Sequence, residues 1–254
     1  MRAAIEGVCG GRVVEARTQP GGFSPGLAAR DLPIPRLRGM VDRPPWMALV
    51  LDDVAGRQPA LPWLAAELKQ VVAVLDHLAD ALTPAPVVVP TVGERLGGEF
   101  TGWRTLAAAT NPGRLDPWSR EHLDRLADLE TTWVEHAAGD SLLHADIRAD
   151  NLLLADRGPV VVDWPWACRG AAVVDFVLFA PSVVMQGGPP PAELTAWSRC
   201  CRAVGRETLA ALVCGAAGYV TEQSLRPPPP GLPTVRAFQA AQGIAARRWP
   251  AELI

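Results

Sequence analysis

Apolar residues recur at helical spacing in two long stretches of the chain. After Pro62, leucines and valines follow one another every three or four residues, which predicts an amphipathic helix with one buried face. The side chains expected on that face are Leu64, Leu68, Val71, Val72, Leu75, Leu78 and Leu82. A second helix is expected to begin at Asp116 and Pro117, because an aspartate cap followed by proline favours helix initiation. The residues that this helix would direct inward are Leu123, Leu126, Leu129 and Trp133.

The positions of proline and glycine predict where the other helices end and where the chain is irregular. The connection Pro84–Gly113 is rich in glycine and is expected to be irregular. From Asp175 onward the chain is expected to be mostly helical, with breaks at Pro189–Pro191 and Pro227–Pro230. These breaks predict several helices rather than one long one.

Short apolar runs predict strands in two parts of the chain. Near the start, Val13–Thr18 indicates a strand, Pro33–Pro45 is a proline-spaced stretch, and the continuous apolar run within Trp46–Val54 is typical of a buried strand. Later, Asn151–Leu154 and Val160–Asp163 flank a glycine-containing turn and predict a β-hairpin. A small strand-rich N-terminal part followed by a larger helical part with one embedded hairpin predicts an α+β protein with two lobes.

Composition narrows the possible functions. The 254 residues are 49% hydrophobic and 20% charged, which fits a folded protein rather than a disordered or fibrous one. The net charge of −3 lacks the basic excess of a nucleic-acid-binding protein, and no apolar run has the length of a membrane helix or the pattern of a signal peptide. The five cysteines form no CxxC pair, which indicates reduced thiols. We therefore expect a cytoplasmic protein without nucleic-acid or membrane partners.

The predicted hairpin brings two polar side chains together. If it turns midway between residues 156 and 157, residue 154 faces 159, and Asn151 and Asp163 meet at its open end. Carboxylate and amide oxygens are hard ligands of the kind that Mg²⁺ accepts while keeping several waters. Asp146 precedes the hairpin by a short loop, where its carboxylate could accept a hydrogen bond from an attacking hydroxyl.

The order His144-x-Asp146, Asn151 five residues later, and a hairpin ending in Asp163-Trp164 resembles the aminoglycoside phosphotransferase family, which has a protein-kinase-like fold. The resemblance implies that Asp146 is the catalytic base and that Asn151 and Asp163 bind Mg²⁺. It also implies that His144 supports the loop structurally. The expected reaction is the transfer of phosphate from ATP or GTP to a hydroxyl of a small molecule.

The same resemblance assigns roles to neighbouring residues. Arg148 stands where protein kinases carry a lysine near the transferred phosphate, and Asp175 corresponds to an aspartate that caps the backbone of the catalytic loop. A simple helix cap is an equally good interpretation of Asp175. Ala145 replaces the usual glycine of the motif.

The nucleotide is expected to bind to the N-terminal lobe, by the same resemblance. Gly21, Gly22 and Ser24 lie in a glycine-rich loop that could cover phosphates, although a plain hairpin turn has the same pattern. The run that contains Leu51 and Asp53 resembles the strand and hinge that contact adenine. We expect residues 1–55 to form this lobe and hinge, and residues 56–254 to form the helical lobe.

The N-terminal lobe is expected to be truncated. A kinase-like fold needs a lysine strand, a helix and another strand before the hinge, roughly 30–40 residues, whereas residues 27–45 supply nineteen, four of them proline. The only lysine, Lys69, lies in the later helical segment. The alternatives are therefore a weak phosphotransferase, a pseudokinase that binds a nucleotide or a partner, and a degenerate chain that folds poorly.

Charge along the chain bears on the acceptor. Residues 64–140 carry twelve acidic and six basic side chains, while residues 176–254 carry four glutamates and seven arginines. In the resembling family the final helices help to line the acceptor cleft, and a polycationic acceptor prefers an acidic cleft. The final helices of this chain are not obviously suited to such an acceptor.

Overall fold

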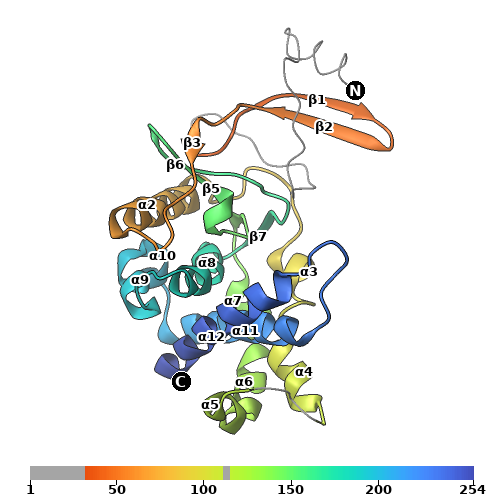
Figure 1. The fold of residues 1–254 in the computed structure, drawn as a ribbon, viewed down its shortest axis with the longest axis vertical. Helices are drawn as coiled ribbons and strands as arrows, with labels where there is room; N and C mark the ends of the chain where they lie inside the picture. Colours follow the sequence, from red (N-terminus) through yellow and green to blue (C-terminus); the bar gives the residue numbers. More distant parts are fainter. Residues whose placement is uncertain (1–31, 111–114) are drawn as a thin grey trace.

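The computed structural model describes residues 32–110 and 115–254. Most of the strands gather at one end of the molecule, and helices make up most of the rest (Figure 1). The described chain therefore has the α+β composition that the sequence predicts. The predicted strand at 13–18 and the glycine-rich loop after it lie outside the described residues.

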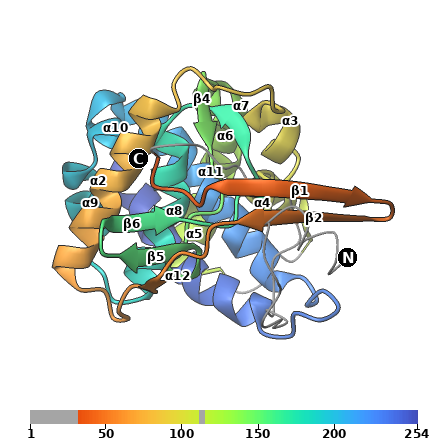
Figure 2. The same cartoon turned by 90° about the horizontal axis from the view of Figure 1, so that it is seen from above.

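Strands β1 (Leu37–Arg43) and β2 (Trp46–Leu51) form an antiparallel ribbon that projects from the helical body (Figure 2). Strand β1 was not predicted, because residues 33–45 have the pattern of a proline-spaced stretch. The prolines fall before and after β1 rather than within it, so every residue of the strand can donate a backbone hydrogen bond.

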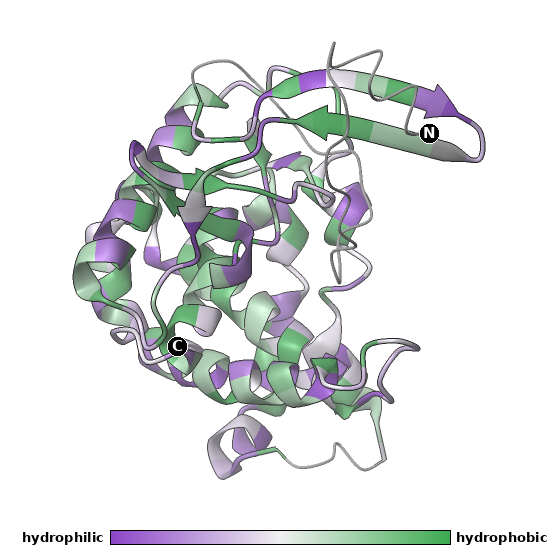
Figure 3. Cartoon of the chain, turned by 45° about the horizontal axis from the view of Figure 1, so that its top comes forward, coloured by the Kyte–Doolittle hydropathy of each residue, from purple (hydrophilic) through white to green (hydrophobic). Residues whose placement is uncertain are grey.

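The expectation that the run at 46–54 is a buried strand is wrong. Met47 is 53% exposed and Leu51 is 39% exposed. Figure 3 shows β2 as hydrophobic over most of its length, yet β1 is its one partner among the described strands. A continuous apolar run indicates a strand but does not specify how many layers cover it.

The predicted hairpin is confirmed. Strands β5 (Leu152–Ala155) and β6 (Gly158–Val161) pair antiparallel, with Leu154 opposite Pro159 as the proposed turn requires. Strand β3 (Gly56–Arg57) joins the other edge of β5, which gives a three-stranded sheet in the order β3-β5-β6.

Helix α2 (Ala65–Ala81) confirms the first helical prediction. Six of the seven expected side chains are buried: Leu68, Val71, Val72, Leu75, Leu78 and Leu82. Leu64 is 54% exposed because it is the N-cap residue, outside the first helical turn.

The second predicted helix is divided into three. These helices are α5 (Pro117–Glu121), α6 (Leu123–Glu130) and α7 (Trp133–Ala137). Asp116 caps the first, since its Oδ1 accepts a hydrogen bond from the Ser119 amide at 3.0 Å. Leu126 and Trp133 are buried, whereas Leu123 and Leu129 are only partly buried.

The connection 84–113 is not irregular throughout, contrary to expectation. It contains α3 (Val92–Leu96) and α4 (Gly102–Ala108). Thr91 and Glu94 form a capping box that begins α3, a Thr-x-x-Glu signal that was present in the sequence. At α4 the cap comes from far along the chain, because the carboxylate of Glu130 accepts the Trp103 and Arg104 amides at 3.0 and 3.1 Å.

The last part of the chain is helical, as expected. Its helices are α8 (Val173–Met185), α9 (Pro191–Trp197), α10 (Arg199–Ala203), α11 (Arg206–Leu225) and α12 (Val235–Leu253). The breaks at 189–191 and 227–230 separate α8 from α9 and α11 from α12. Within residues 32–110 and 115–254, none of these or the earlier helices combines the length and apolar character needed to cross a membrane.

Candidate active site

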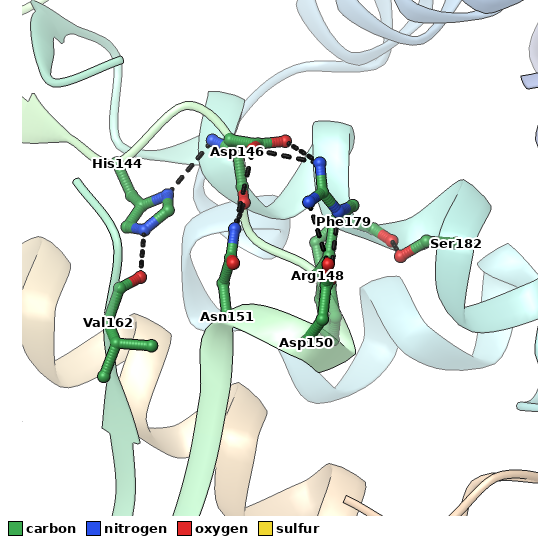
Figure 4. Close-up of polar contacts among 8 residues, drawn as sticks. All are labelled: His144, Asp146, Arg148, Asp150, Asn151, Val162, Phe179 and Ser182. Atoms are coloured by element: carbon green, nitrogen blue, oxygen red, sulfur yellow. Dashed lines mark hydrogen bonds and ion pairs between the residues drawn. The ribbon is translucent and has the colours of Figure 1, made fainter. Parts of the chain in front are cut away.

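A short loop between two sheets carries the residues of the His144-x-Asp146 motif. Strand β4 (Ser141–Leu143), paired with β7 (Cys168–Gly170), leads into this loop. A single 3-10 turn, η1 (Ala149–Asn151), then connects the loop to β5. Both ends of the loop are thus fixed by backbone pairing within a few residues. Figure 4 shows several of the polar contacts that hold it.

His144 is fully buried and binds the loop from inside. Its Nε2 lies 2.9 Å from the carbonyl oxygen of Val162, and its Nδ1 accepts the Asp146 amide at 3.1 Å (Figure 4). A neutral ring with its proton on Nε2 satisfies both bonds. Burial lowers the pKa of His144 to about 4, so the ring stays neutral near pH 7. The ring also packs against Trp164 with centroids 4.8 Å apart.

Asp175, in the first turn of α8, holds the start of the loop from the opposite side. Its carboxylate accepts the amides of His144 at 2.9 Å and Ala145 at 2.6 Å. Burial raises the pKa of Asp175 to about 6, while these two hydrogen bonds lower it and the charge of Asp146 raises it further. Ala145 has a φ of 63°, in the left-handed region that favours glycine.

Asp146 faces a guanidinium group. Arg148 NH1 lies 2.8 and 3.0 Å from the two carboxylate oxygens of Asp146. Its Nε and NH2 donate to Asp150 at 3.0 and 2.9 Å. Burial raises the pKa of Asp146 to about 6; Arg148 lowers it, and the charges of Asp150 and Asp163 raise it. The carboxylate is therefore more basic than an ordinary aspartate and ionised above pH 6.

Asn151 and Asp163 leave the hairpin at the same end. The backbone carbonyl of Asn151 accepts the Val162 amide at 3.0 Å, which places residues 151 and 162 opposite each other as predicted. The Asn151 amide nitrogen donates to the carbonyl oxygen of Asp146 at 2.8 Å. Asp163 follows with a φ of 63°, a conformation that aspartate tolerates, and its charge acts on both Asp146 and Arg148.

Asn151 and Asp163 carry the oxygen atoms at this end of the hairpin that could contribute to a magnesium site. Because the Asn151 nitrogen binds Asp146, its oxygen is the atom left for a cation, and Asp163 adds a carboxylate. Among the described residues, no group of three or more histidine, cysteine, aspartate or glutamate side chains could hold a metal by itself. Two hard oxygen ligands suit Mg²⁺ that also binds phosphate and water, and they do not suit a structural zinc ion.

A cavity of about 470 Å³ opens beside the loop. Residues 145–148 form one wall, and the others come from the end of α3, from α8, α11 and α12, and from the 227–234 connection. A volume of this order accommodates a drug-sized molecule. A hydroxyl bound in the cavity could therefore reach Asp146.

The nucleotide-side residues are only partly described. Gly21, Gly22 and Ser24 lie outside the described residues. Leu51 ends β2, and Asp53 is exposed in the connection to β3. The ammonium group of Lys69 lies 4.9 Å from the ring centroid of Trp197, on the helical side of the molecule. The only lysine of the sequence thus contacts an aromatic ring.

Two parts of the site were not predicted from the sequence. The first is Asp150, which shares the Arg148 guanidinium with Asp146; its position two residues after Arg148 was the available signal. The second is the cavity, whose walls come from helices far apart in the sequence. Spacing within each helix indicates buried faces and gives no sign of which faces enclose a cavity.

Solved structures with similar folds are aminoglycoside phosphotransferases. The GDP complex of aminoglycoside 2'-phosphotransferase-IIIa has a TM-score of 0.58 and 14% identity, over 88% of this chain and 77% of that one. A thermostable mutant of APH(4)-Ia in its apo form has a TM-score of 0.51 and 18% identity, over 87% and 80%. These matches show that the chain has their kinase-like α+β fold.

Comparison with curated proteins gave no match. The model of the phosphotransferase enzyme family, APH, matches residues 27–212, which include the whole loop and hairpin. This match spans most of the chain, and the structural matches agree with it. The chain therefore belongs to the phosphotransferase enzyme family.

Proposed function

We propose that this protein transfers the γ-phosphate of ATP or GTP to a hydroxyl of a small molecule, with Mg²⁺ as cofactor. The observation that supports this most is the position of Asp146, a carboxylate of raised pKa at the wall of a cavity. The Asn151 amide nitrogen donates to its backbone carbonyl oxygen at 2.8 Å, and the charge of Asp163 acts on its carboxylate. Structural relatives were solved with GDP, and with AMP-PNP and hygromycin B. Two structures of APH(4)-Ia each carry one alanine substitution, which replaces an aspartate in one structure and an asparagine five positions later in the other. Asp146 and Asn151 have the same spacing.

Each residue of the site would have a separate role in the transfer. Asp146 accepts the proton of the acceptor hydroxyl while the hydroxyl oxygen forms a bond to the γ-phosphorus. The bond from that phosphorus to the bridging oxygen breaks, and the nucleoside diphosphate leaves. Asn151 and Asp163 would hold Mg²⁺, which supplies charge neutralisation at the phosphate oxygens. His144 and Asp175 fix the loop so that Asp146 keeps its position.

The N-terminal lobe determines whether this activity is strong or weak. We propose that residues 1–55 form a shortened nucleotide-binding lobe, with Gly21, Gly22, Ser24, Leu51 and Asp53 at the nucleotide. The loss of a lysine aimed at developing phosphate charge typically costs roughly 10²–10³ in rate. The alternative function is a pseudokinase that binds nucleotide without turnover, which the position of Lys69 favours.

The test combines turnover with binding. The purified full chain is incubated with ATP or GTP, Mg²⁺ and a broad panel of alcohols, and phosphate esters are detected by ³¹P NMR. We expect a product, and we expect Asp146→Asn to lower kcat by about 10²–10⁴ because it removes the base. Asp156→Asn, at the exposed hairpin turn, is the matched control and should leave the rate unchanged. If no ester forms and Asp146→Asn changes nothing, the enzymatic proposal is wrong.

Thermal unfolding, read together with the turnover assay, separates the two candidate functions. For either function, nucleotide should raise the melting temperature, and Asp163→Ala should remove the Mg²⁺-dependent part of that rise. A rise without turnover supports the pseudokinase. No rise with either nucleotide contradicts both.

A further inference from the structure

Among the described residues, the walls of the cavity beside Asp146 carry little net charge. These residues include two acidic side chains in the lining, Glu99 and Asp146, and two basic ones, Arg148 and Arg236. Asp146 is already paired with Arg148, so one carboxylate and one guanidinium remain for a ligand. Such a lining offers no cluster of carboxylates to a polycation, which would lose hydration without regaining partners.

Arg236 is held in position by uncharged groups. Its NH1 donates to the side-chain oxygens of Gln223 and Gln239 at 2.8 and 2.7 Å, and its Nε donates to the Pro227 carbonyl at 3.1 Å. Among the described residues, no carboxylate forms an ion pair with it. Within that part of the chain the positive charge has no acidic partner, and NH2 is the guanidinium nitrogen that makes none of these three hydrogen bonds and could donate to a ligand.

Much of the remaining wall is apolar or aromatic. Phe100 and Tyr219 stack with ring centroids 5.2 Å apart, and Leu178 and Phe238 add further apolar surface. At the exposed edge, Trp166 and Leu232 are 44% and 56% exposed, which is unusual for such large apolar side chains. A ligand with an apolar body would cover these surfaces and release their water.

We propose that the acceptor is an apolar alcohol without net positive charge, which carries a carbonyl or carboxylate oxygen that binds Arg236. This inference rests on the proposed function, because it assumes that the cavity holds the phosphoryl acceptor. The hydroxyl lies toward Asp146, the oxygen acceptor group lies at Arg236, and the apolar body packs between Phe100, Tyr219 and Phe238. Polycationic aminoglycosides would then be poor ligands of this member of the family.

Binding measured without nucleotide tests the inference separately from catalysis. The probes are matched sets of a steroid, a macrocyclic lactone and a biaryl, each bearing a hydroxyl and prepared in neutral, carboxylate and amine forms. Kanamycin, which was bound in one solved relative, is the polycationic reference. Titration calorimetry should show that the neutral or carboxylate forms of at least one set bind about tenfold or more tightly than its amine form and kanamycin.

Variants of Arg236 locate the oxygen acceptor group. For the set of probes that binds, Arg236→Gln should lower the affinity for the carboxylate form by about tenfold. It should lower the affinity for the neutral form less and leave the affinity for the amine form unchanged. Arg236→Lys should restore part of the preference for the carboxylate, because it keeps the charge and loses the fork geometry. Arg226→Gln is the matched control, since Arg226 pairs with Glu222 outside the cavity wall. Thermal unfolding of each variant checks that the 227–236 connection is retained.

The binding and turnover results distinguish failure of the inference from failure of the proposed function. Tighter binding of kanamycin or of the amine forms, equal binding of all forms, or binding by no apolar alcohol would overturn the inference. Phosphorylation of kanamycin would overturn it while supporting the proposed function. The predicted order of affinities without any phosphate ester would support the class of ligand assigned to the cavity, and it would count against the proposed function and against the ligand being a phosphoryl acceptor.

Discussion

Replacing Arg148 by glutamine tests what this guanidinium does for the proposed base. The resemblance to protein kinases implies that Arg148 lies near the transferred phosphate. In the structure, NH1 binds both carboxylate oxygens of Asp146, and Nε and NH2 bind Asp150. The contacts indicate that Arg148 controls the charge and position of Asp146. The two roles predict different pH profiles.

The size of the effect follows from burial and charge. Burial raises the pKa of Asp146 to about 6, and Arg148 opposes this rise. An arginine beside an aspartate lowers its pKa by about 1–3 units, and the lower end applies here because the two side chains are 32% and 28% exposed. Arg148→Gln should therefore raise the pKa of Asp146 by about one unit, to about 7. The ionised fraction at pH 7 would fall from roughly nine-tenths to roughly one half.

The assay is the pH dependence of kcat/KM for phosphoryl transfer, together with a ¹³C NMR titration of the Asp146 carboxyl group in the free protein. Since the ionised form is the base, the acidic limb should move to higher pH by about one unit. The rate at pH 7 should fall about twofold and recover fully at high pH. Arg157→Gln, on the exposed hairpin turn, makes the same change in net charge and should shift neither measurement.

A different result would refute this reasoning. If Arg148 binds the transferred phosphate, kcat/KM should fall by roughly 10²–10³ at every pH, without recovery. An unchanged titration of Asp146 in Arg148→Gln would show that the ion pair does not set its pKa. The uniform loss of rate would support the role near the phosphate that the resemblance implies for Arg148.

Two further predictions concern stability. Ala145→Gly should raise the free energy of unfolding by about 0.5–1 kcal/mol, because removing the strain at φ 63° outweighs the greater conformational freedom of glycine in the unfolded chain. A melting temperature equal to or below that of the wild type would contradict this. Gly102→Ala should lower the free energy of unfolding in urea by about 2 kcal/mol, because its Cβ would lie 2.0 Å from the Gly218 carbonyl oxygen and push α4 from α11. Gly98→Ala is the control, since its Cβ would meet no atom within 4 Å, and equal effects of the two substitutions would refute the packing explanation.

The hairpin and its loop could be predicted because short-range patterns specify them. The register follows from the turn alone, and Leu154 lies opposite Pro159 as the sequence requires. The buried face of α2 could be predicted for a similar reason, because helical spacing determines which side chains share a face. Leu64 shows the limit, since one residue before the helix the same pattern no longer applies.

Features that depend on distant partners could not be predicted. The exposure of β2 depends on how many strands join it, and α4 owes its cap to Glu130, which lies 27 residues after Trp103. The cavity is a stronger example, because Phe100 and Arg236 line the same cavity although they lie far apart in the sequence. Only tertiary packing brings such residues together.

The contacts of the loop bear on the choice between enzyme and pseudokinase. Its backbone and its histidine are held by Val162, Asn151 and Asp175, which all lie within the hairpin or at the start of α8. None of these contacts involves the N-terminal strands. A shortened N-terminal lobe would therefore leave Asp146 in place and would act through the position of the nucleotide. If the protein proves inactive, substitutions in the loop should leave nucleotide affinity unchanged apart from the part that depends on Mg²⁺, and the cause should be sought in residues 1–55.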